Sequence, residues 1–278
     1  MNSSKSQLKD VLERLYRKYN RFELIAPDPL QFVYKYENPA DMEVAGLFAA
    51  VLAYGRVRQI EKSVAGLLSR MAPGPYEFIR GFGSAQRQGL KDFKHRFTTG
   101  DDLADLIELL RDVLNEHGSI ERFFLKGYNP SDETIIAALE RFCDSLLELS
   151  AGRASKGLAY LLPRPSTGSA CKRLNMFLRW MVRKDDVDPG LWSSIDKAVL
   201  VVPIDVHMGR LSRLLGLCNR KTVSLSAAME ITKNFSALEP YDPVKYDFAL
   251  SRIGILENCT GRRRTGCEAC ELFEFCRS

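Results

Sequence analysis

The sequence predicts an all-α protein, and three observations point to that class. Apolar residues recur at intervals of three and four along most of the 278 residues, which is the spacing of the buried face of a helix. Residues that cap helices precede many of these runs, and glycines follow several of them. The only strand-like run, residues 198–204, has no second run with which it could pair.

The expected helices follow one another from the N-terminus. The first covers residues 8–19, where the apolar side chains share one face. The next begins at Asn38, a capping residue followed by proline, and stops at Gly55. A Pro/Gly turn over residues 161–168 and a long connection over residues 184–199 are expected between later helices, with no obvious linker between lobes. Those later helices should begin at or near Asp101, Ser131, Ser169, Asp205, Ser224 and Asp242.

Composition and charge exclude several classes of protein. Hydrophobic residues make up 45% and charged residues 27%, which are ordinary values for a globular domain and not for a disordered or fibrous chain. No run approaches the roughly 18 apolar residues of a transmembrane helix. Because the N-terminus also lacks the apolar run of a signal peptide, we expect a cytoplasmic protein with no membrane partner. The net charge of +5 permits a polyanionic partner without requiring one.

Four of the seven cysteines lie within the last twenty residues, in the pattern Cys259-x7-Cys267-x2-Cys270-x5-Cys276. In a cytoplasmic chain such a group is more typical of a metal site than of disulfides. Zinc ribbons usually have two close C-x2-C pairs, whereas only the central pair is close here, which favours a 4Fe–4S cluster. Zinc and unligated thiols are the alternatives. The scattered cysteines are expected to be packing residues: Cys143, Cys171 and Cys218.

The cysteine spacing resembles the C-x6-C-x2-C-x5-C iron–sulfur loop of the endonuclease III and adenine glycosylase branch of the helix-hairpin-helix DNA glycosylases. The first spacer here has one residue more, which is a small change for a surface loop. The resemblance implies a two-lobed helix-hairpin-helix fold over residues 1–258 and a 4Fe–4S cluster loop over residues 259–278. It also implies a monomer that acts on double-stranded DNA with a damaged base. Residues 172–183 are similar to segments of bacterial proteins with no assigned activity, so an uncharacterised branch of the superfamily is expected.

A second resemblance centres on Asp205. The segment Val202-Pro-Ile-Asp-Val-His-Met208 is similar to the V-P-V-D-V-H-M and V-D-T-H segments that carry the catalytic aspartate of those glycosylases. Asp205 stands at the start of an expected helix, where the positive end of the helix dipole keeps a carboxylate ionised. An ionised carboxylate in that place is suited to face a developing cation. The alternative is a helix cap with no further role.

A hairpin and a lysine precede that aspartate. Leu162-Pro163 followed by Gly168 resembles a lengthened form of the L-P-G-V-G hairpin of these enzymes, although G-V-G itself is absent. Gly168 would let backbone amides approach a DNA phosphate. In the bifunctional members a lysine nucleophile sits at the start of the next helix, and Lys172 occupies that place here. The alternatives are a surface lysine with no role and Lys184, which falls at a helix end, where the dipole stabilises its charge.

The resemblance also implies DNA-contacting residues elsewhere. Such glycosylases flip the target nucleotide and fill the gap with a side chain from the turn after an early helix. Arg56 or Gln59 would fill it, and a plain solvated turn is the alternative. Residues 91–97 alternate basic and aromatic side chains, which fits a phosphate or base contact as well as a half-buried loop. The arginines beside the cysteines would contact DNA phosphates: Arg262, Arg263 and Arg264.

The sequence therefore predicts a DNA glycosylase that removes a damaged base, with AP lyase activity if Lys172 attacks the sugar. Asp205 would stabilise the oxocarbenium-like sugar, and water would attack if Lys172 is inert. The alternative is a non-catalytic iron–sulfur nucleic-acid-binding protein, which the altered hairpin favours. A zinc-bound transcription regulator fits less well, because neither a separate ligand-binding domain nor a second C-x2-C pair is found. No motif identifies the base that is removed.

Overall fold

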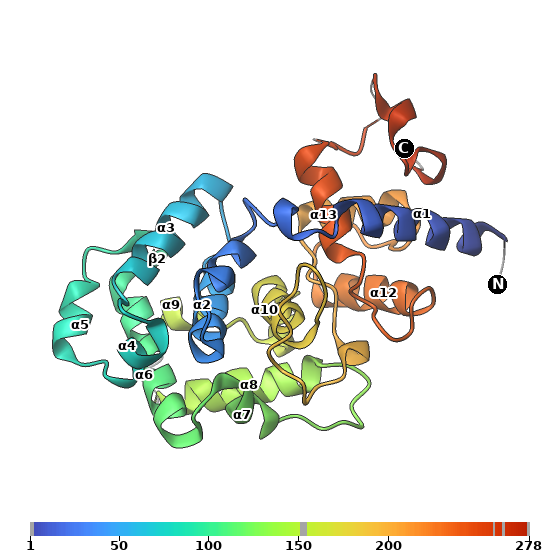
Figure 1. Cartoon of the computed structure of the whole chain (residues 1–278). Helices are drawn as coiled ribbons and strands as arrows, with labels where there is room; N and C mark the ends of the chain where they lie inside the picture. The colour runs from blue at the N-terminus through green and yellow to red at the C-terminus, as the bar shows by residue number, and fades with distance from the viewer. Residues whose placement is uncertain (1–2, 151–154, 258, 263–264, 277–278) are drawn as a thin grey trace.

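The computed structural model describes residues 3–150, 155–257, 259–262 and 265–276, which are helical apart from one hairpin and the connecting loops (Figure 1). The helices are α1 (Ser3–Tyr19), α2 (Pro39–Val51), α3 (Val57–Ser69), α4 (Pro75–Arg80), α5 (Ser84–Gly89), α6 (Gly100–His117), α7 (Ile120–Leu125), α8 (Ile136–Leu149), α9 (Lys156–Leu161), α10 (Lys172–Val182), α11 (Val206–Leu214), α12 (Leu225–Ser236) and α13 (Asp247–Leu256). The hairpin consists of β1 (Lys94–His95) and β2 (Thr98–Thr99). The predicted all-α class is confirmed at this level. None of the described helices is both long enough and apolar enough to cross a membrane.

The helices form two groups that lie on either side of α10 (Figure 1). One group holds α3 to α6 and the β-hairpin, and the other holds α1, α12, α13 and the C-terminal segment. α2 packs on α10, while α1 and α11 both pack on α13. A single continuous cluster of buried apolar residues runs through both groups. The two groups therefore share one core.

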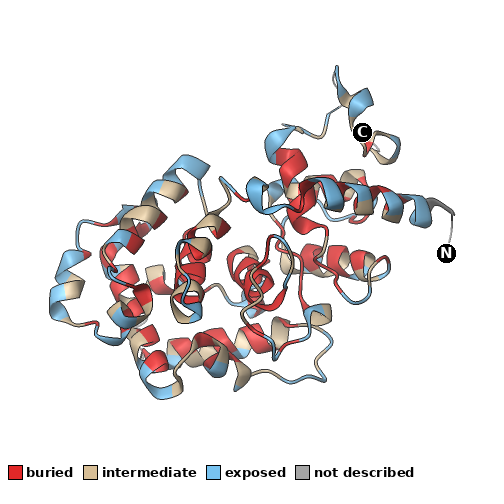
Figure 2. Cartoon of the chain, viewed as in Figure 1, coloured by how far each residue is buried: buried red, intermediate tan, exposed pale blue. Residues whose placement is uncertain are grey.

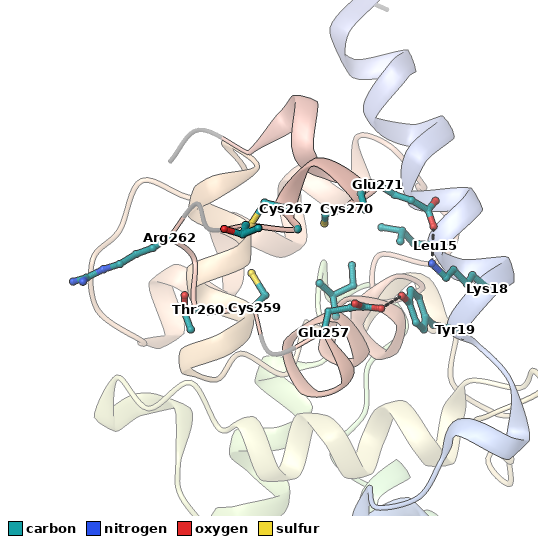
Figure 3. Close-up of a pocket in the computed structure, with 14 residues that line it drawn as sticks. Leu15, Lys18, Tyr19, Glu257, Cys259, Thr260, Arg262, Cys267, Cys270 and Glu271 are labelled. Atoms are coloured by element: carbon teal, nitrogen blue, oxygen red, sulfur yellow. Dashed lines mark hydrogen bonds and ion pairs between the residues drawn. The ribbon is translucent and has the colours of Figure 1, made fainter.

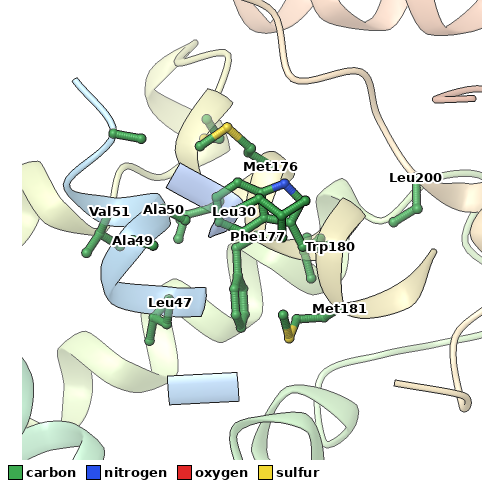
Figure 4. Packing of buried hydrophobic residues seen from close by; sticks show 14 of the residues in the cluster. Leu30, Leu47, Ala49, Ala50, Val51, Met176, Phe177, Trp180, Met181 and Leu200 are labelled. Carbon is green, nitrogen blue, oxygen red and sulfur yellow. The ribbon is translucent and has the colours of Figure 1, made fainter. Parts of the chain in front are cut away.

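The contact between α2 and α10 lies at the centre of that core (Figure 4). Phe177, Trp180 and Met181 of α10 are almost completely buried, and burial is concentrated where the central helices face one another (Figure 2). α2 meets them closely, because a Cβ atom at Gly46 would stand 3.0 Å from the Met181 methyl carbon. Each buried side chain of this size contributes about 1.5–3 kcal/mol to stability. This packing fixes the position of α10, whose first residue is Lys172.

A buried charge network fixes α10 from its other end. Arg179 and Arg183 bind carboxylates at N–O distances of 2.5 to 3.1 Å, and no side chain in the network is more than 12% exposed. Because buried charges are costly without partners, the network requires all of its members together. It joins α10 to residues 184–199 and to the segment that enters α13. The carboxylates belong to Asp185, Asp188, Asp242 and Asp247.

Several predicted helix starts are confirmed. The Asn38 side chain accepts a hydrogen bond from the Ala40 amide at 3.0 Å, as a cap of α2 should. Asp205 and Ser224 cap α11 and α12 in the same way. α6 begins one residue before Asp101, because the cap is Thr99.

Two other predicted starts are wrong and the start predicted near Ser169 lies three residues early; in each case the polar side chain has a different partner. The Ser131 hydroxyl bonds to the Asn129 side chain in a turn, and α8 begins five residues later. Ser169 accepts from the amide of Cys171, whose left-handed φ of +45° delays α10. The Asp242 carboxylate accepts from Arg183 of the buried charge network, so it does not cap α13.

The strand prediction needs two corrections. Residues 198–204 have a 3₁₀ turn followed by buried extended chain, in which the Val202 amide donates to the Thr232 hydroxyl at 3.0 Å. They form no strand. The two-stranded hairpin formed by β1 and β2 was not predicted, because strands of two residues carry no periodic signal.

Candidate active site

Lys172 and Asp205 meet at the starts of two helices. The Lys172 Nζ atom lies 3.4 Å from Asp205 Oδ2. Lys172 is the first residue of α10 and Asp205 caps α11, so both side chains stand at the positive ends of helix dipoles. About a third of each side chain is exposed, 33% for Lys172 and 36% for Asp205. The pair is held by the fold yet open to solvent.

The two oxygens of Asp205 have separate partners. Oδ1 accepts from the Met208 amide at 2.8 Å, which completes the cap of α11, while Oδ2 faces Lys172. Burial alone would raise the pKa of this carboxyl, but Lys172, the Met208 amide and His207 outweigh burial and lower the pKa. Asp205 is therefore ionised at neutral pH and turned toward a cation.

The structure separates the two lysine candidates. Lys184 lies beyond the C-terminal end of α10, where its backbone bridges to Pro189. α10 has eleven residues, so its two ends are about 16 Å apart at 1.5 Å per residue. Lys172, and not Lys184, therefore stands beside Asp205.

A cleft of about 600 Å³ opens beside this pair. It is lined by Lys172, by Ile204 next to Asp205, and by Tyr54 and Tyr160. The two tyrosine rings meet edge to face, with centroids 5.2 Å apart. Val223 also lines the cleft and is exposed. The cleft thus combines a cation, a carboxylate nearby and aromatic walls.

Arg173 lines the same cleft and was not predicted from the sequence. It is 9% exposed and donates to the Val51 carbonyl oxygen at 2.6 Å and to the Tyr160 carbonyl oxygen. Its guanidinium carbon lies 5.1 and 4.6 Å from the ring centroids of Tyr54 and Tyr160. Within the described residues no carboxylate pairs with it, and burial lowers its pKa. The sequence signal that could have identified Arg173 is a basic residue on the apolar face of a predicted helix.

Residues 162–168, the predicted hairpin of the helix-hairpin-helix motif, lie next to the cleft. Gly168 is exposed with φ +78°, and its carbonyl oxygen accepts from the Leu225 amide at the start of α12. Its own amide donates to Pro165 at 2.8 Å, and the amides of Ser166 and Thr167 are also bonded within the protein. These amides are not available to a phosphate without rearrangement. A DNA contact at Gly168 stays a prediction.

Arg56 precedes α3 as its N-cap residue, Gln59 lies in the first turn of α3, and both are exposed. Tyr54, two residues before Arg56, lines the cleft. The structure thus brings this segment to the rim of the cleft, but neither predicted side chain is part of its wall. Their role as the residue that fills the gap stays a prediction.

The C-terminal cysteines surround a second cavity. Cys259, Cys267 and Cys270 line a space of about 370 Å³ between α1, α13 and the C-terminal segment, and they face one another across it (Figure 3). Together with Cys276 they also line a small apolar cavity of about 40 Å³ against α11. Burial and the three other thiols of this group raise the pKa of Cys270. The larger cavity exceeds the roughly 30 Å³ share of a water molecule by far, so a multi-atom group fits.

The role of these cysteines as ligands of a 4Fe–4S cluster or of zinc stays a prediction. Among the described residues no three His, Cys, Asp or Glu side chains are placed to hold a metal ion. Arg210 donates to the Cys259 carbonyl oxygen at 2.7 Å, and its buried Nε has no partner in the part of the chain that the structure describes. Arg262 lines both cavities, with its guanidinium end extending away from the cysteines (Figure 3), and Arg263 and Arg264 lie outside the described residues.

A family model described as a protein of unknown function (DUF2400) matches residues 28–256, most of the chain. The chain belongs to the DUF2400 family. The match to DUF2400 includes Lys172, Asp205 and the whole cleft, whereas α1 and the four cysteines lie outside it. No curated protein and no solved structure matches the chain.

Proposed function

We propose that this protein is a DNA glycosylase that removes a damaged base. The observation that carries the proposal is the contact of 3.4 Å between Lys172 and Asp205, at two helix starts beside an aromatic cleft. A nucleophile next to an ionised carboxylate is the arrangement that cleavage of an N-glycosidic bond needs. The cleft walls formed by Tyr54 and Tyr160 offer ring surfaces for an extruded base.

The proposed reaction assigns one role to each group. As the bond between C1′ and the base breaks, the Asp205 carboxylate stabilises the positive charge that develops on the sugar. Attack by Lys172 requires its Nζ to lose a proton, and Asp205 is placed to accept it. The Lys172 nitrogen then bonds to C1′ as the bond to the base breaks, and the base leaves with the proton that Asp205 accepted. Cleavage of the C1′–O4′ bond, with a proton passing from the Lys172 nitrogen to O4′, gives a Schiff base that permits β-elimination of the 3′ phosphate. If water attacks instead, the enzyme is monofunctional.

We further propose that Cys259, Cys267, Cys270 and Cys276 hold a 4Fe–4S cluster with a structural role, and zinc is the alternative metal. Such a cluster would carry negative charge, and the Arg210 Nε, which has no partner among the described residues, is a donor suited to it. The purified protein should contain about four irons per chain, the content of a cubane. One zinc and no iron would refute this assignment. Reduced thiolates are consistent with the cytoplasmic location that we propose.

The experiment that tests the function is a base-excision assay on duplexes that each carry one damaged base. Asp205→Asn keeps a helix-capping side chain but removes the charge, so DNA binding should stay near wild type while excision falls at least about 100-fold. Asp196→Asn is the matched control, because Asp196 is an exposed aspartate that also caps a helical turn. Excision by Asp205→Asn at near the wild-type rate would refute the proposal.

A second candidate is a non-catalytic nucleic-acid-binding protein. The backbone amides of residues 166–168 favour it. These donors would position a phosphate, but they are already hydrogen-bonded within the protein. In that case the wild-type protein would bind DNA but excise no base from any duplex, and no variant of Asp205 would alter binding by more than about twofold.

A further inference from the structure

The turn of the β-hairpin carries two unusual side chains. β1 and β2 pair through Lys94 with Thr99 and His95 with Thr98, so the turn consists of Arg96 and Phe97 alone. Arg96 has φ +53°, in the left-handed region where hairpin turns favour glycine or asparagine. Phe97 is 70% exposed, although a phenylalanine is normally part of the core. The guanidinium of Arg96 lies over the Phe97 ring, 5.4 Å from its centroid.

The β-hairpin is fixed by hydrogen bonds on its buried side. His95 is completely buried, with Nδ1 2.8 Å from the Ser63 hydroxyl and Nε2 3.0 Å from the Tyr54 carbonyl oxygen. The Tyr54 hydroxyl lies 2.8 Å from the His95 carbonyl oxygen and 2.7 Å from the Thr98 hydroxyl. These contacts fix the hairpin to the end of α2. Phe97 is therefore presented to solvent by a fixed support and does not sit on a loose loop.

Phe97 also continues the aromatic wall of the cleft outward. Its ring centroid lies 6.2 Å from that of Tyr160 in an edge-to-face contact, and Tyr160 in turn contacts Tyr54. Tyr54 and Tyr160 line the cleft next to Lys172. An aromatic row thus leads from the candidate site to the exposed hairpin turn.

The surface around Phe97 is positively charged. Of the acids near the β-hairpin, Asp92 forms an ion pair with Arg70 at 2.7 Å, Asp101 lies 3.8 Å from Arg87, and Asp102 accepts from the Thr99 amide at 2.9 Å. Flat rings amid exposed cations are the combination that binds single-stranded or extruded nucleotides, by stacking on bases and pairing with phosphates. A lipid surface would match the cations but not the rigid aromatic row. Two segments supply the exposed cations, residues 56–58 before and within α3 and residues 91–96 around β1. They are Arg56, Arg58, Lys91, Lys94 and Arg96.

We propose that the Phe97 ring stacks on a nucleobase of bound DNA at the edge of the cleft. Arg96 would approach the adjacent phosphate, and the base would lie against the face of Phe97 that solvent now covers. This inference rests on the proposed function, since it requires DNA binding. It assigns a base contact to the β-hairpin within residues 91–97, for which the sequence left a half-buried loop as the alternative, and it is separate from the gap-filling role predicted for Arg56 or Gln59.

The test uses tryptophan as a probe. The natural tryptophans, Trp180 and Trp192, are only 0% and 2% exposed, so Phe97→Trp would supply the exposed indole. Phe22→Trp is the matched control, because Phe22 is also an exposed phenylalanine but precedes α2 at a separate turn. Each protein is titrated with a lesion-bearing duplex and, separately, with inorganic polyphosphate, while tryptophan fluorescence is recorded.

DNA should quench the fluorescence of Phe97→Trp, polyphosphate should not, and Phe22→Trp should respond to neither. Phe97→Ala should weaken DNA binding roughly 5- to 150-fold, the range for loss of one stacked base. If the wild-type protein binds DNA, unchanged fluorescence of Phe97→Trp together with unchanged affinity of Phe97→Ala would overturn the stacking proposal alone. If the wild-type protein binds no DNA, the proposed function falls as well.

Discussion

The two ends of α10 carry the same kinds of charged group in opposite settings. At the N-terminal end, Lys172 faces Asp205, and about a third of each side chain is exposed. Toward the C-terminal end, Arg183 binds three carboxylates, and its side chain is 3% exposed. The buried carboxylates are saturated with partners, whereas the Lys172–Asp205 pair opens onto a cleft. Exposure and unused bonding capacity, and not the presence of an ion pair, distinguish a candidate site from scaffolding.

The largest expected effect on stability is at the buried end. Arg183→Met removes the partner of three carboxylates at once, so the free energy of unfolding should fall by about 3–5 kcal/mol. Lys172→Met, the matched change at the other end of the helix, should cost less than about 1 kcal/mol, because its pair is partly exposed. Denaturant unfolding measures both. Equal losses would remove the distinction between the two ends.

A smaller effect on the free energy of unfolding is expected at acidic pH. Burial alone would raise the pKa of Asp185, but Arg183 and two backbone amides hold it at about 2. Because this pKa is below that of the unfolded chain, near 3.9, the stabilisation is complete above that pH and is lost as the pH falls toward 2. It amounts to about 2–3 kcal/mol. Denaturant unfolding at a series of pH values measures this. The Asp185→Asn variant should be less stable than wild type at neutral pH, and its free energy of unfolding should depend less on pH below about 4. The same pH dependence as wild type below pH 4 would contradict this.

The smallest stability effect is expected at the candidate site. Asp205→Asn should change the free energy of unfolding by less than about 1 kcal/mol, since asparagine caps a helix about as well as aspartate. Thermal unfolding of wild type and variant at the same pH would measure it. A loss as large as that of Arg183→Met would mean that Asp205 is part of the scaffold.

Local features of the fold could be predicted from the sequence, and long-range ones could not. Asn38, Ser224 and Asp205 act as caps because a cap bonds within its own helix turn. Asp242 fails as a predicted cap because its carboxylate is bound by Arg183, which is 59 residues away. No periodic pattern reports such a contact.

The same division applies to the candidate site. The family resemblance singled out Lys172 and Asp205, and the structure brings them together across 33 residues, which neither the spacing nor the helix pattern could establish. Arg173 was not identified, and for residues 91–97, which include Phe97, a base contact and a half-buried loop were left open, because the significance of both residues comes from segments distant in sequence, namely α9 and the end of α2. Their chemistry is visible in the sequence, but their neighbours are not.

The central claim is that Lys172 and Asp205 form a reactive pair, and borohydride trapping on duplex DNA with one abasic site tests it most directly. A working lysine gives a covalent adduct with the sugar, and Lys156→Ala is the matched control, because Lys156 is likewise the first residue of a helix. We predict an adduct with the wild-type protein and with Lys156→Ala, and none with Lys172→Ala. An adduct that persists at the wild-type level in Lys172→Ala would contradict the assignment of the nucleophile.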